Sequence, residues 1–559
     1  MLKASKDLEE QLLKQRRQAE ENDAKRRADR LGLAYIDLIS VKVPTEIKAM
    51  RLVPEEEAKR ALLVPLQVLR KKLIVAAFDP DIPEAKKAIE KLRKIYETEV
   101  AVVSMTSLKH AWSYYHYVIK EEGEISGKIE IDETKLQSLQ ATIKNLEQLK
   151  ETIRSFKSPL VSQTLEIIIA GALSLKASDI HLEPNDERGA IRLRIDGLLH
   201  AAYEEFTPAT YHSVVTRIKL LSNLKLNITD QPQDGRFTIG LKDRDIEIRT
   251  SVIPSEYGET VVLRILDPLA LKVNLEELGW RPDDLAIVKA EIAKPNGLIL
   301  NTGPTGSGKT TTLYAFLKYV FRPEIKVITV EDPIEYHLDG ISQTQVDPGA
   351  GYTFASGLRS ILRQDPNVIL VGEIRDKETA EIAMNAALTG HIVFSTLHTN
   401  DAVGAVPRLI DLGAKPQILG PALALVIAQR LIRILCPQCK TTKPNDSKFK
   451  TKAEEFLKNL PSRVDRTLYK QLSIYEPKGC DQCGSLGYRG RISIFELFVV
   501  NENIEQAIYA NPTELTLTDL AKKQGMTTMQ EDGILKMFMG ITSQAEVERL
   551  TGPINWLKD

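Results

Sequence analysis

The middle of the chain, residues 275–435, alternates short runs of mostly apolar residues with longer amphipathic segments. Its clearest strand-like runs are residues 298–300, 327–330, 368–371 and 392–395. Runs that are apolar throughout, rather than at every second position, are typical of parallel strands covered on both faces. Apolar residues at helical spacing, as in residues 313–320, predict the covering helices. We therefore expect a largely parallel α/β sheet between two layers of helices.

Residues 159–270 show a different pattern, which predicts an α+β domain. An apolar-rich helix is expected over residues 161–175. Residues 191–195 alternate apolar and charged positions, as a half-exposed strand does. The same alternation in residues 237–241 and 246–248, on either side of a Lys242-Asp243 turn, predicts a hairpin.

The preceding region, residues 31–118, predicts a small α/β domain. Residues 73–78 indicate a strand, and a turn follows at 79–83. Apolar positions between residues 85 and 92 then share one helix face, and residues 100–103 predict a second strand.

Two charged segments flank this small domain. Residues 1–30 carry few apolar side chains, so we expect a solvated helix or a disordered arm. Residues 119–158 begin with a charged, turn-like linker over 121–135. Apolar positions between residues 136 and 153 then predict a connecting helix, because the run is too short to indicate a coiled coil.

The composition indicates a multidomain protein and argues against a membrane-spanning or a nucleic-acid-binding protein. A chain of 559 residues is too long for one hydrophobic core, so about three to five domains are expected. The formal charge of −1 argues against bulk nucleic-acid binding, and no direct nucleic-acid partner is expected. No apolar run reaches the roughly 18 residues of a membrane span, and the start of the chain lacks the apolar core of a signal peptide. We expect a cytosolic protein that docks on a membrane through partners.

The first chemical motif is the loop that joins the strand 298–300 to the helix 313–320. The loop and the first helical residues are Gly303, Pro304, Thr305, Gly306, Ser307, Gly308, Lys309, Thr310 and Thr311. This is a complete phosphate-binding loop with the strand and helix that the motif requires. Its glycines let backbone N–H groups surround a polyphosphate, Lys309 reaches the terminal phosphates, and the Thr310 hydroxyl binds Mg²⁺.

Polar clusters follow three of the predicted strands, at the sheet edge where α/β proteins bind ligands. The clusters are residues 331–335, 372–376 and 396–399. Phosphoryl transfer to water needs one group that orients the water and another that holds hydrated Mg²⁺, and Glu335 and Glu373 suit these roles. The alternative for such residues is a helix N-cap, and for Asp332 both interpretations stay open. His398 either senses the γ-phosphate or satisfies a hydrogen bond in the core.

The position after the strand 368–371 departs from the usual pattern. Conventional P-loop hydrolases place an Asp at the end of the second metal-binding strand, whereas Gly372 and then Glu373 stand here. This difference points to one branch of P-loop ATPases.

All four cysteines fall into two Cys-x-x-Cys pairs, Cys436 with Cys439 and Cys480 with Cys483. Two such pairs suit tetrahedral Zn²⁺, with residues 436–490 forming an arm closed by the metal. Unrelated thiols or a redox pair remain the alternatives.

Four motifs of the central region resemble those of the secretion ATPases that drive type II secretion and type IV pilus assembly (the GspE/PilB family). Residues 298–312, 328–336, 363–376 and 390–399 resemble the Walker A, Asp box, Walker B and His box of that family. Residues 177–184 and 233–236 resemble its second N-terminal domain, 487–491 and 525–528 its tail, and 52–76, more weakly, its first N-terminal domain.

The resemblance implies a RecA-like P-loop ATPase core over residues 275–435 in a multidomain α/β protein. A first N-terminal α/β domain (31–118) and a PAS-like α+β domain (159–270) would precede the core. A zinc-binding insertion (436–490) and a helical tail (491–559) would follow it.

The resemblance also assigns roles to individual residues. Glu335 would be the general base, and Glu373 would support Mg²⁺ through water. Arg236 and Arg249 would be arginine fingers offered to the ATPase site, although without the resemblance both indicate ordinary exposed strand residues.

The implied function is that of a hexameric ATPase that uses ATP and Mg²⁺ to drive pilin or pseudopilin polymerisation. Its partners would be an integral membrane platform protein and, through the first domain, a cytoplasmic anchor of the machine. A DNA-uptake or pilus-retraction motor, and a nucleotide-gated scaffold without turnover, are the alternatives. The tetracysteine module argues against retraction motors, which lack it.

Some family members bind cyclic di-GMP through repeated Arg-Leu-Gly-x-x-Leu motifs. Here Arg30-Leu31-Gly32 is followed by Leu33-Ala34-Tyr35, and no second copy occurs. Control by cyclic di-GMP is therefore not expected.

Overall fold

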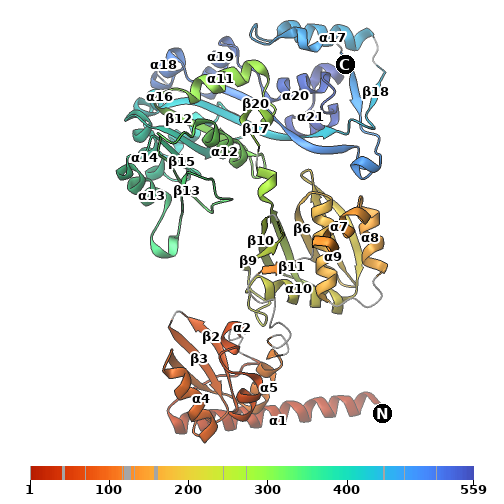
Figure 1. Ribbon diagram of the computed structural model, residues 1–559, viewed down its shortest axis with the longest axis vertical. Coiled ribbons are helices and arrows are strands. Elements are labelled where there is room, and N and C mark those ends of the chain that lie inside the picture. Colours follow the sequence, from red (N-terminus) through yellow and green to blue (C-terminus); the bar gives the residue numbers. More distant parts are fainter. Residues whose placement is uncertain are drawn as a thin grey trace. The chain divides into compact units, whose positions relative to one another are not determined.

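The computed structural model describes residues 2–40, 45–69, 71–115, 118, 128–130, 133–155, 161–242, 244–271, 273–444, 447–470, 472–510 and 513–558. The chain divides into two compact units, Met1–Leu266 and Asp267–Asp559 (Figure 1). None of the described helices combines the length and the apolar character needed to cross a bilayer.

The first sheet of the first unit has the strand order β1-β4-β3-β2. Its strands are β1 (Ala34–Tyr35), β2 (Leu63–Leu69), β3 (Lys72–Ala77) and β4 (Glu97–Val102), and its helices are α2 (Ile47–Met50), α3 (Glu55–Arg60), α4 (Pro83–Arg93) and α5 (Met105–Trp112). The predicted strands and helix of this region are therefore present. Ala85, Ile89 and Leu92 are buried on the inner face of α4, as their helical spacing indicates.

Helix α1 (Leu2–Leu31) confirms the helix among the two alternatives for this segment, but its second half packs against the sheet rather than being solvated. Ala24 and Ala28 are fully buried, and Glu21 accepts hydrogen bonds from Tyr35 and Ser104. The sequence did not indicate this contact, because two of the buried residues of α1, Glu21 and Arg27, are charged.

The second sheet has the strand order β5-β9-β10-β11-β6-β7-β8. Its strands are β5 (Lys128–Glu130), β6 (Ala177–Pro184), β7 (Gly189–Ile195), β8 (Leu198–Phe206), β9 (Gln233–Gly240), β10 (Asp245–Ser255) and β11 (Gly258–Leu266). Helices α7 (Glu133–Thr142), α8 (Leu146–Ser155), α9 (Val161–Ser174) and α10 (Pro208–Leu221) complete it. The predicted hairpin is the antiparallel pair β9–β10, although Asp243 of its turn lies outside the described residues.

The segment 119–158 differs from the prediction in two ways. Strand β5 lies inside the predicted linker and pairs in parallel with β9; residues 121–127 and 131–132 of that linker lie outside the described residues. The single connecting helix is wrong, because Asn145 starts a new helix. Its Oδ1 accepts from the N–H of Gln148 at 2.8 Å, and Gln148 Oε1 accepts from the N–H of Lys144 at 2.8 Å.

The second unit contains a sheet of order β14-β13-β15-β16-β12-β17-β20. Its strands are β12 (Gly297–Thr302), β13 (Val327–Glu331), β14 (Ser342–Gln345), β15 (Val368–Val371), β16 (Ile392–Leu397), β17 (Leu423–Leu435) and β20 (Tyr488–Val499). All neighbouring pairs are parallel except β17–β20. The predicted mostly parallel sheet is confirmed.

Two apolar layers cover this sheet, which explains its continuous apolar runs. Leu298 and Leu300 of β12 face one layer, and Ile299 between them faces the other. The first layer uses α13 (Phe354–Ile361), α14 (Lys377–Leu388), α15 (Ala405–Asp411), α16 (Pro416–Ala422), α18 (Glu502–Ala510) and α19 (Glu514–Lys523); the second uses α11 (Pro282–Ile292) and α12 (Lys309–Val320).

We predicted a helical tail over residues 491–559, but its first part is a strand. Residues up to Val499 belong to β20, which pairs with β17 over most of its length. The remaining elements are β18 (Thr441–Lys443), β19 (Ile474–Glu476), α17 (Ser447–Asn459), α20 (Met529–Phe538), α21 (Gln544–Thr551) and α22 (Asn555–Lys558).

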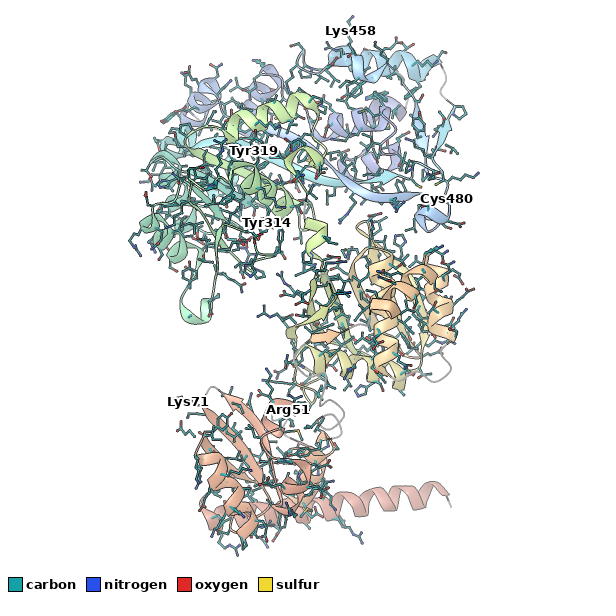
Figure 2. All side chains as sticks on the ribbon, viewed as in Figure 1. Arg51, Lys71, Tyr314, Tyr319, Lys458 and Cys480 are labelled. Atoms are coloured by element: carbon teal, nitrogen blue, oxygen red, sulfur yellow. The ribbon has the colours of Figure 1, made fainter. Side chains whose placement is uncertain are left out.

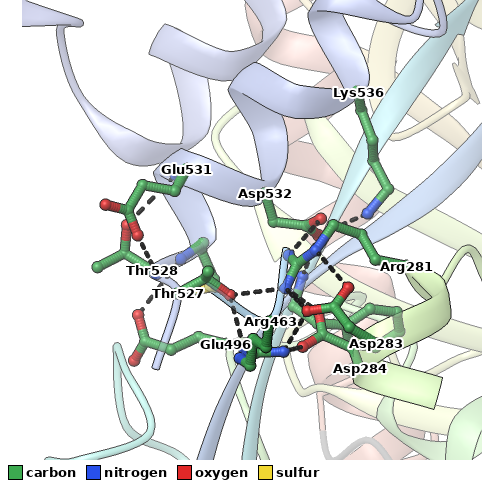
Figure 3. Close-up of polar contacts among 12 residues, drawn as sticks. Arg281, Asp283, Asp284, Arg463, Glu496, Thr527, Thr528, Glu531, Asp532 and Lys536 are labelled. Carbon is green, nitrogen blue, oxygen red and sulfur yellow. Dashed lines mark hydrogen bonds and ion pairs between the residues drawn. The ribbon is translucent and has the colours of Figure 1, made fainter. Parts of the chain in front are cut away.

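A buried ionic cluster ties the last helices to the start of α11 (Figure 3). Arg281 binds Asp284 at 2.7 Å and Asp532 of α20 at 3.0 Å. Arg463 also binds Asp284, and Lys536 binds Asp532. Burial raises the pKa of Asp284 to about 6. Charges buried this deeply are tolerated only when paired, so loss of any one partner would leave a costly uncompensated charge.

Candidate functional site

The phosphate loop connects β12 to α12 with the backbone geometry that anion binding requires. Gly303, Gly306 and Gly308 have φ values of 147°, 80° and 93°, which residues with a side chain rarely adopt. Gly308 is the N-cap of α12, so the positive end of that helix faces the loop. Thr310 lies in the first turn of α12, beside Lys309.

Lys309 lies against the loop that it follows. Its Nζ donates to the carbonyl oxygens of Gly303 at 2.7 Å and Pro304 at 3.2 Å. Burial lowers the pKa of Lys309 to about 8; the charge of Arg430 acts in the same direction, and that of Glu373 opposes it. The ammonium group is therefore poised to lose its proton just above neutral pH.

This pKa predicts that nucleotide binding takes up a proton. Bound phosphates favour the charged ammonium and raise its pKa, so binding above pH 8 requires protonation of Lys309. The Kd for ADP is expected to rise by about tenfold per pH unit above 8. Calorimetric titration in two buffers of different ionisation enthalpy measures the proton uptake. Arg430→Met should move the pH midpoint of this proton uptake to a higher pH. Equal binding heats in both buffers at pH 8.5 would contradict the prediction.

Glu373 and His398 meet at the ends of β15 and β16. Glu373 is buried, and its carboxylate lies 3.6 Å from His398 Nε2 and 2.6 Å from Arg375 Nη2. Burial, assisted by the charge of Lys309, lowers the pKa of His398, so its ring is neutral at pH 7. The His398 side chain is 51% exposed, which rules out the interpretation of a histidine enclosed in the core.

The Asp box is fixed to α12 by a buried polar cluster. Glu331 accepts hydrogen bonds from Tyr314 of α12 at 2.5 Å, from Thr329 at 2.6 Å and from Gln343 at 3.1 Å. The Tyr314 hydroxyl also accepts from the backbone N–H of Glu335. Glu335 is therefore attached to the helix that carries Lys309; Tyr314 is labelled in Figure 2.

The helix N-cap interpretation fails for Asp332, Glu335 and Glu373. No helix begins within residues 331–340, where Asp332 is exposed and Glu335 is half-buried. In the Walker B region Asp376, not Glu373, caps α14 by accepting from the N–H of Thr379 at 2.8 Å.

Arg236 and Arg249 lie directly opposite each other on β9 and β10 of the first unit. Their row continues across the sheet to Arg264 on β11, Asp179 on β6 and Arg194 on β7. Asp179 pairs with Arg264 at 3.0 Å and Arg194 at 3.3 Å. Glu247 lies 3.2 Å from Arg249 Nε and 3.8 Å from Arg236 Nη1.

Like charges directly opposite each other on paired strands are destabilising. Arg236 and Arg249 are such a pair, and the Arg236 side chain is 74% exposed. The exposed guanidinium group of Arg236 is therefore accessible to an anion. Sequence analysis missed Arg264, which only the strand register places beside Arg249.

The four cysteines converge at the end of the β17–β20 pair, where Figure 2 labels Cys480. All four thiols are free, and their sulfur atoms lie within 4.8 Å of one another. Three sulfur pairs are separated by 3.8 Å. Sulfurs bound to one zinc at about 2.3 Å in a tetrahedron are about 3.8 Å apart, so the cluster could hold this metal.

Backbone N–H groups point at the sulfurs. Gly479 donates to Cys439 at 3.3 Å, and Gly487 and Cys480 each donate to Cys483 at 3.2 Å. Such bonds favour thiolates, which are the metal-binding form of cysteine.

Comparisons with protein families match nearly the whole chain. A family model described as Type II/IV secretion system protein matches residues 155–549, and one described as MshEN domain matches residues 31–120.

Curated relatives extend this similarity. "Type II secretion system protein E" of Pseudomonas aeruginosa is 43% identical over 394 residues, which cover 70% of this chain and 76% of that protein. "Type IV pilus assembly ATPase PilB" of Myxococcus xanthus is 36% identical over 529 residues, which cover 93% of this chain and 89% of that protein.

The structure of the Legionella pneumophila ATPase DotB is similar with a TM-score of 0.51 at 22% identity, covering 70% of this chain and 97% of that one. Identity this low shows a shared fold alone.

Proposed function

The chain belongs to the Type II/IV secretion system protein family and is an ATPase, and from this premise we propose that it powers pilin or pseudopilin polymerisation in type IV pilus assembly or type II secretion. We further propose a homo-hexamer, cytoplasmic and held at the inner membrane by its partners. These partners are an integral membrane platform protein and an anchor protein that binds the first N-terminal domain.

One arrangement carries the proposal for the chemistry: the phosphate loop and two acidic side chains belong to one sheet edge. Glu373 is buried and influences the charge of Lys309, while Glu335 is bound through its backbone to the Tyr314 hydroxyl on α12. Hydrolysis needs a polyphosphate site, a base for water and a metal-binding group within one pocket.

In this mechanism the loop N–H groups and Lys309 hold the phosphates of ATP. The Thr310 hydroxyl and, through water, Glu373 would hold Mg²⁺, which neutralises charge that develops on the phosphate oxygens. Glu335 accepts the proton of the attacking water, and its backbone bond to Tyr314 limits its movement. Neutral His398, next to Glu373, donates to the γ-phosphate.

We propose that Cys436, Cys439, Cys480 and Cys483 hold structural Zn²⁺ and that residues 436–490 form a zinc-binding insertion. The matched sulfur separations and the N–H groups directed at them support this assignment. We also propose that residues 159–270 form the PAS-like domain of the family.

Removal of this zinc is expected to unfold the insertion. Structural zinc contributes about 10–16 kcal/mol in small domains, and the apolar residues of this arm have no core of their own but share one with α20–α22. Purified protein should contain one zinc per chain, and a chelator or Cys436→Ser with Cys480→Ser should expose residues 440–478 to protease. Ser447→Ala on α17 is the control. Protein from zinc-replete cells that lacks zinc would contradict the assignment.

A DNA-uptake motor would use the same ATPase chemistry. To test which machine the protein serves, its gene is deleted and the deletion strain is complemented with wild-type or Lys309→Ala protein. Loss of surface pili or of secretion, restored by wild type alone, supports the proposal. Intact pili and secretion with lost transformation would support DNA uptake instead.

A further inference from the structure

A fully buried amide lies beneath the phosphate loop. Gln429, in the middle of β17, is 1% exposed and makes three side-chain hydrogen bonds. Its Oε1 accepts from Asn301 Nδ2 at 2.8 Å and from the Thr312 hydroxyl at 2.9 Å. Its Nε2 donates to the Ser493 hydroxyl of β20 at 2.9 Å.

The two groups that share Gln429 Oε1 come from opposite ends of the phosphate loop. Asn301 is near the end of β12, directly before the loop, and Thr312 is in the first turn of α12, directly after it. A carbonyl oxygen has two lone pairs, so these bonds use its full capacity as an acceptor. One oxygen atom therefore fixes the separation of the loop's two ends.

The loop backbone also packs directly on Gln429. A Cβ atom at Gly303 would lie 2.6 Å from the backbone oxygen of Gln429, and one at Gly308 would lie 2.8 Å from its Nε2. These contacts are closer than any side chain allows. Two loop glycines thus rest on this single residue, one on its backbone and one on its amide.

We propose that Gln429 is a positioning residue for nucleotide binding. It does not contact the nucleotide; it holds the ends of the phosphate loop at the spacing that directs the loop N–H groups and Lys309 toward the phosphates. Ser493 orients the amide, because its hydroxyl takes the N–H and so leaves the oxygen facing Asn301 and Thr312. The inference rests on the ATPase activity and on no particular secretion machine.

Gln429→Met tests the proposal, because it keeps the side-chain length and removes all three hydrogen bonds. The KM for ATP is expected to rise at least about tenfold, since Asn301 and Thr312 lose their shared acceptor. The kcat at saturating ATP should fall by less than about threefold, because bound nucleotide restores the loop geometry. An unchanged KM, or an equal fall in kcat with unchanged KM, would overturn the proposal.

Gln429→Glu supplies a readout that a merely structural role would not give. A protonated carboxyl group can replace the amide at all three bonds, whereas the carboxylate places a negative charge under the phosphates. The ratio of mutant to wild-type KM should therefore fall as the pH is lowered from 8 to 6. The same ratio for Gln429→Met should stay constant, and identical pH profiles for both variants would contradict the mechanism.

Two further variants complete the experiment. Thr542→Val removes an equally buried hydroxyl that donates to the Arg433 oxygen of the same strand at 2.8 Å, and it should leave KM unchanged. Thr312→Val removes one bond to Gln429 and should raise KM by about threefold. If Gln429→Met does not fold, Thr312→Val decides: an unchanged KM there overturns the proposal. Wild-type turnover measured in parallel separates this result from a failure of the ATPase assignment.

Discussion

Replacement of Glu335 by Gln is expected to lower the ATP turnover rate by about 10²–10⁴-fold, the usual contribution of a general base. The amide keeps the size and polarity of the side chain but cannot accept the proton of the attacking water. The Tyr314 contact is to the backbone of Glu335, so the loop should keep its position. The Kd for ADP should therefore stay within about twofold of wild type, because no phosphate-binding group has changed.

Asp332→Asn is the matched control, since it makes the same carboxylate-to-amide change three residues earlier. Asp332 is exposed, whereas Glu335 is half-buried. Phosphate release and binding of fluorescent ADP are measured on all three proteins, with melting temperature as the check on folding. Full turnover in Glu335→Gln would show that the base is another residue, and a loss confined to Asp332→Asn would assign the role to Asp332.

The sequence predicts the central sheet well because its strands are buried on both faces. Strands buried on both faces must be apolar throughout, so runs such as residues 368–371 stand out between amphipathic helices. Strand β20 was not predicted, because its partner β17 is distant in the sequence and the polar cysteine segment lies between them. Pairing of that kind depends on the tertiary fold, which no local pattern specifies.

In the candidate site, too, some features follow from a local sequence pattern and others depend on the tertiary fold. The phosphate loop is readable because a short contiguous segment performs the binding. The supporting residues are harder to predict. Glu331 lies in a predicted polar cluster, but Tyr314 and Gln429 belong to no motif, and their contacts form only when α12, β13 and β17 meet. The break after Thr142 is a local case, because the Asn145 side chain accepts from Gln148 N–H and the Gln148 side chain accepts from Lys144 N–H. A periodicity argument does not take such side-chain caps into account.

Loss of an arginine finger is expected to be the other severe defect. If Arg236 and Arg249 reach the ATPase site, alanine at either position should lower the turnover rate by up to about 10³–10⁵-fold. The affinity for nucleotide should change little. Their direct cross-strand pairing places two positive charges side by side, and negative charge that develops on a γ-phosphate would relieve their repulsion. Arg192→Ala is the control, because Arg192 lies on β7 outside the row and pairs with Glu183.

Mixing two inactive proteins distinguishes a finger that acts within a subunit from one that acts between subunits. Arg249→Ala subunits keep Glu335, and Glu335→Gln subunits keep Arg249. If the finger crosses a subunit boundary, random assembly at equal amounts completes about one site in four, because each site needs a particular pair of neighbours in a ring. Turnover should then recover to about a quarter of wild type. If each subunit supplies its own finger, no site is complete, and the mixture stays as inactive as its components.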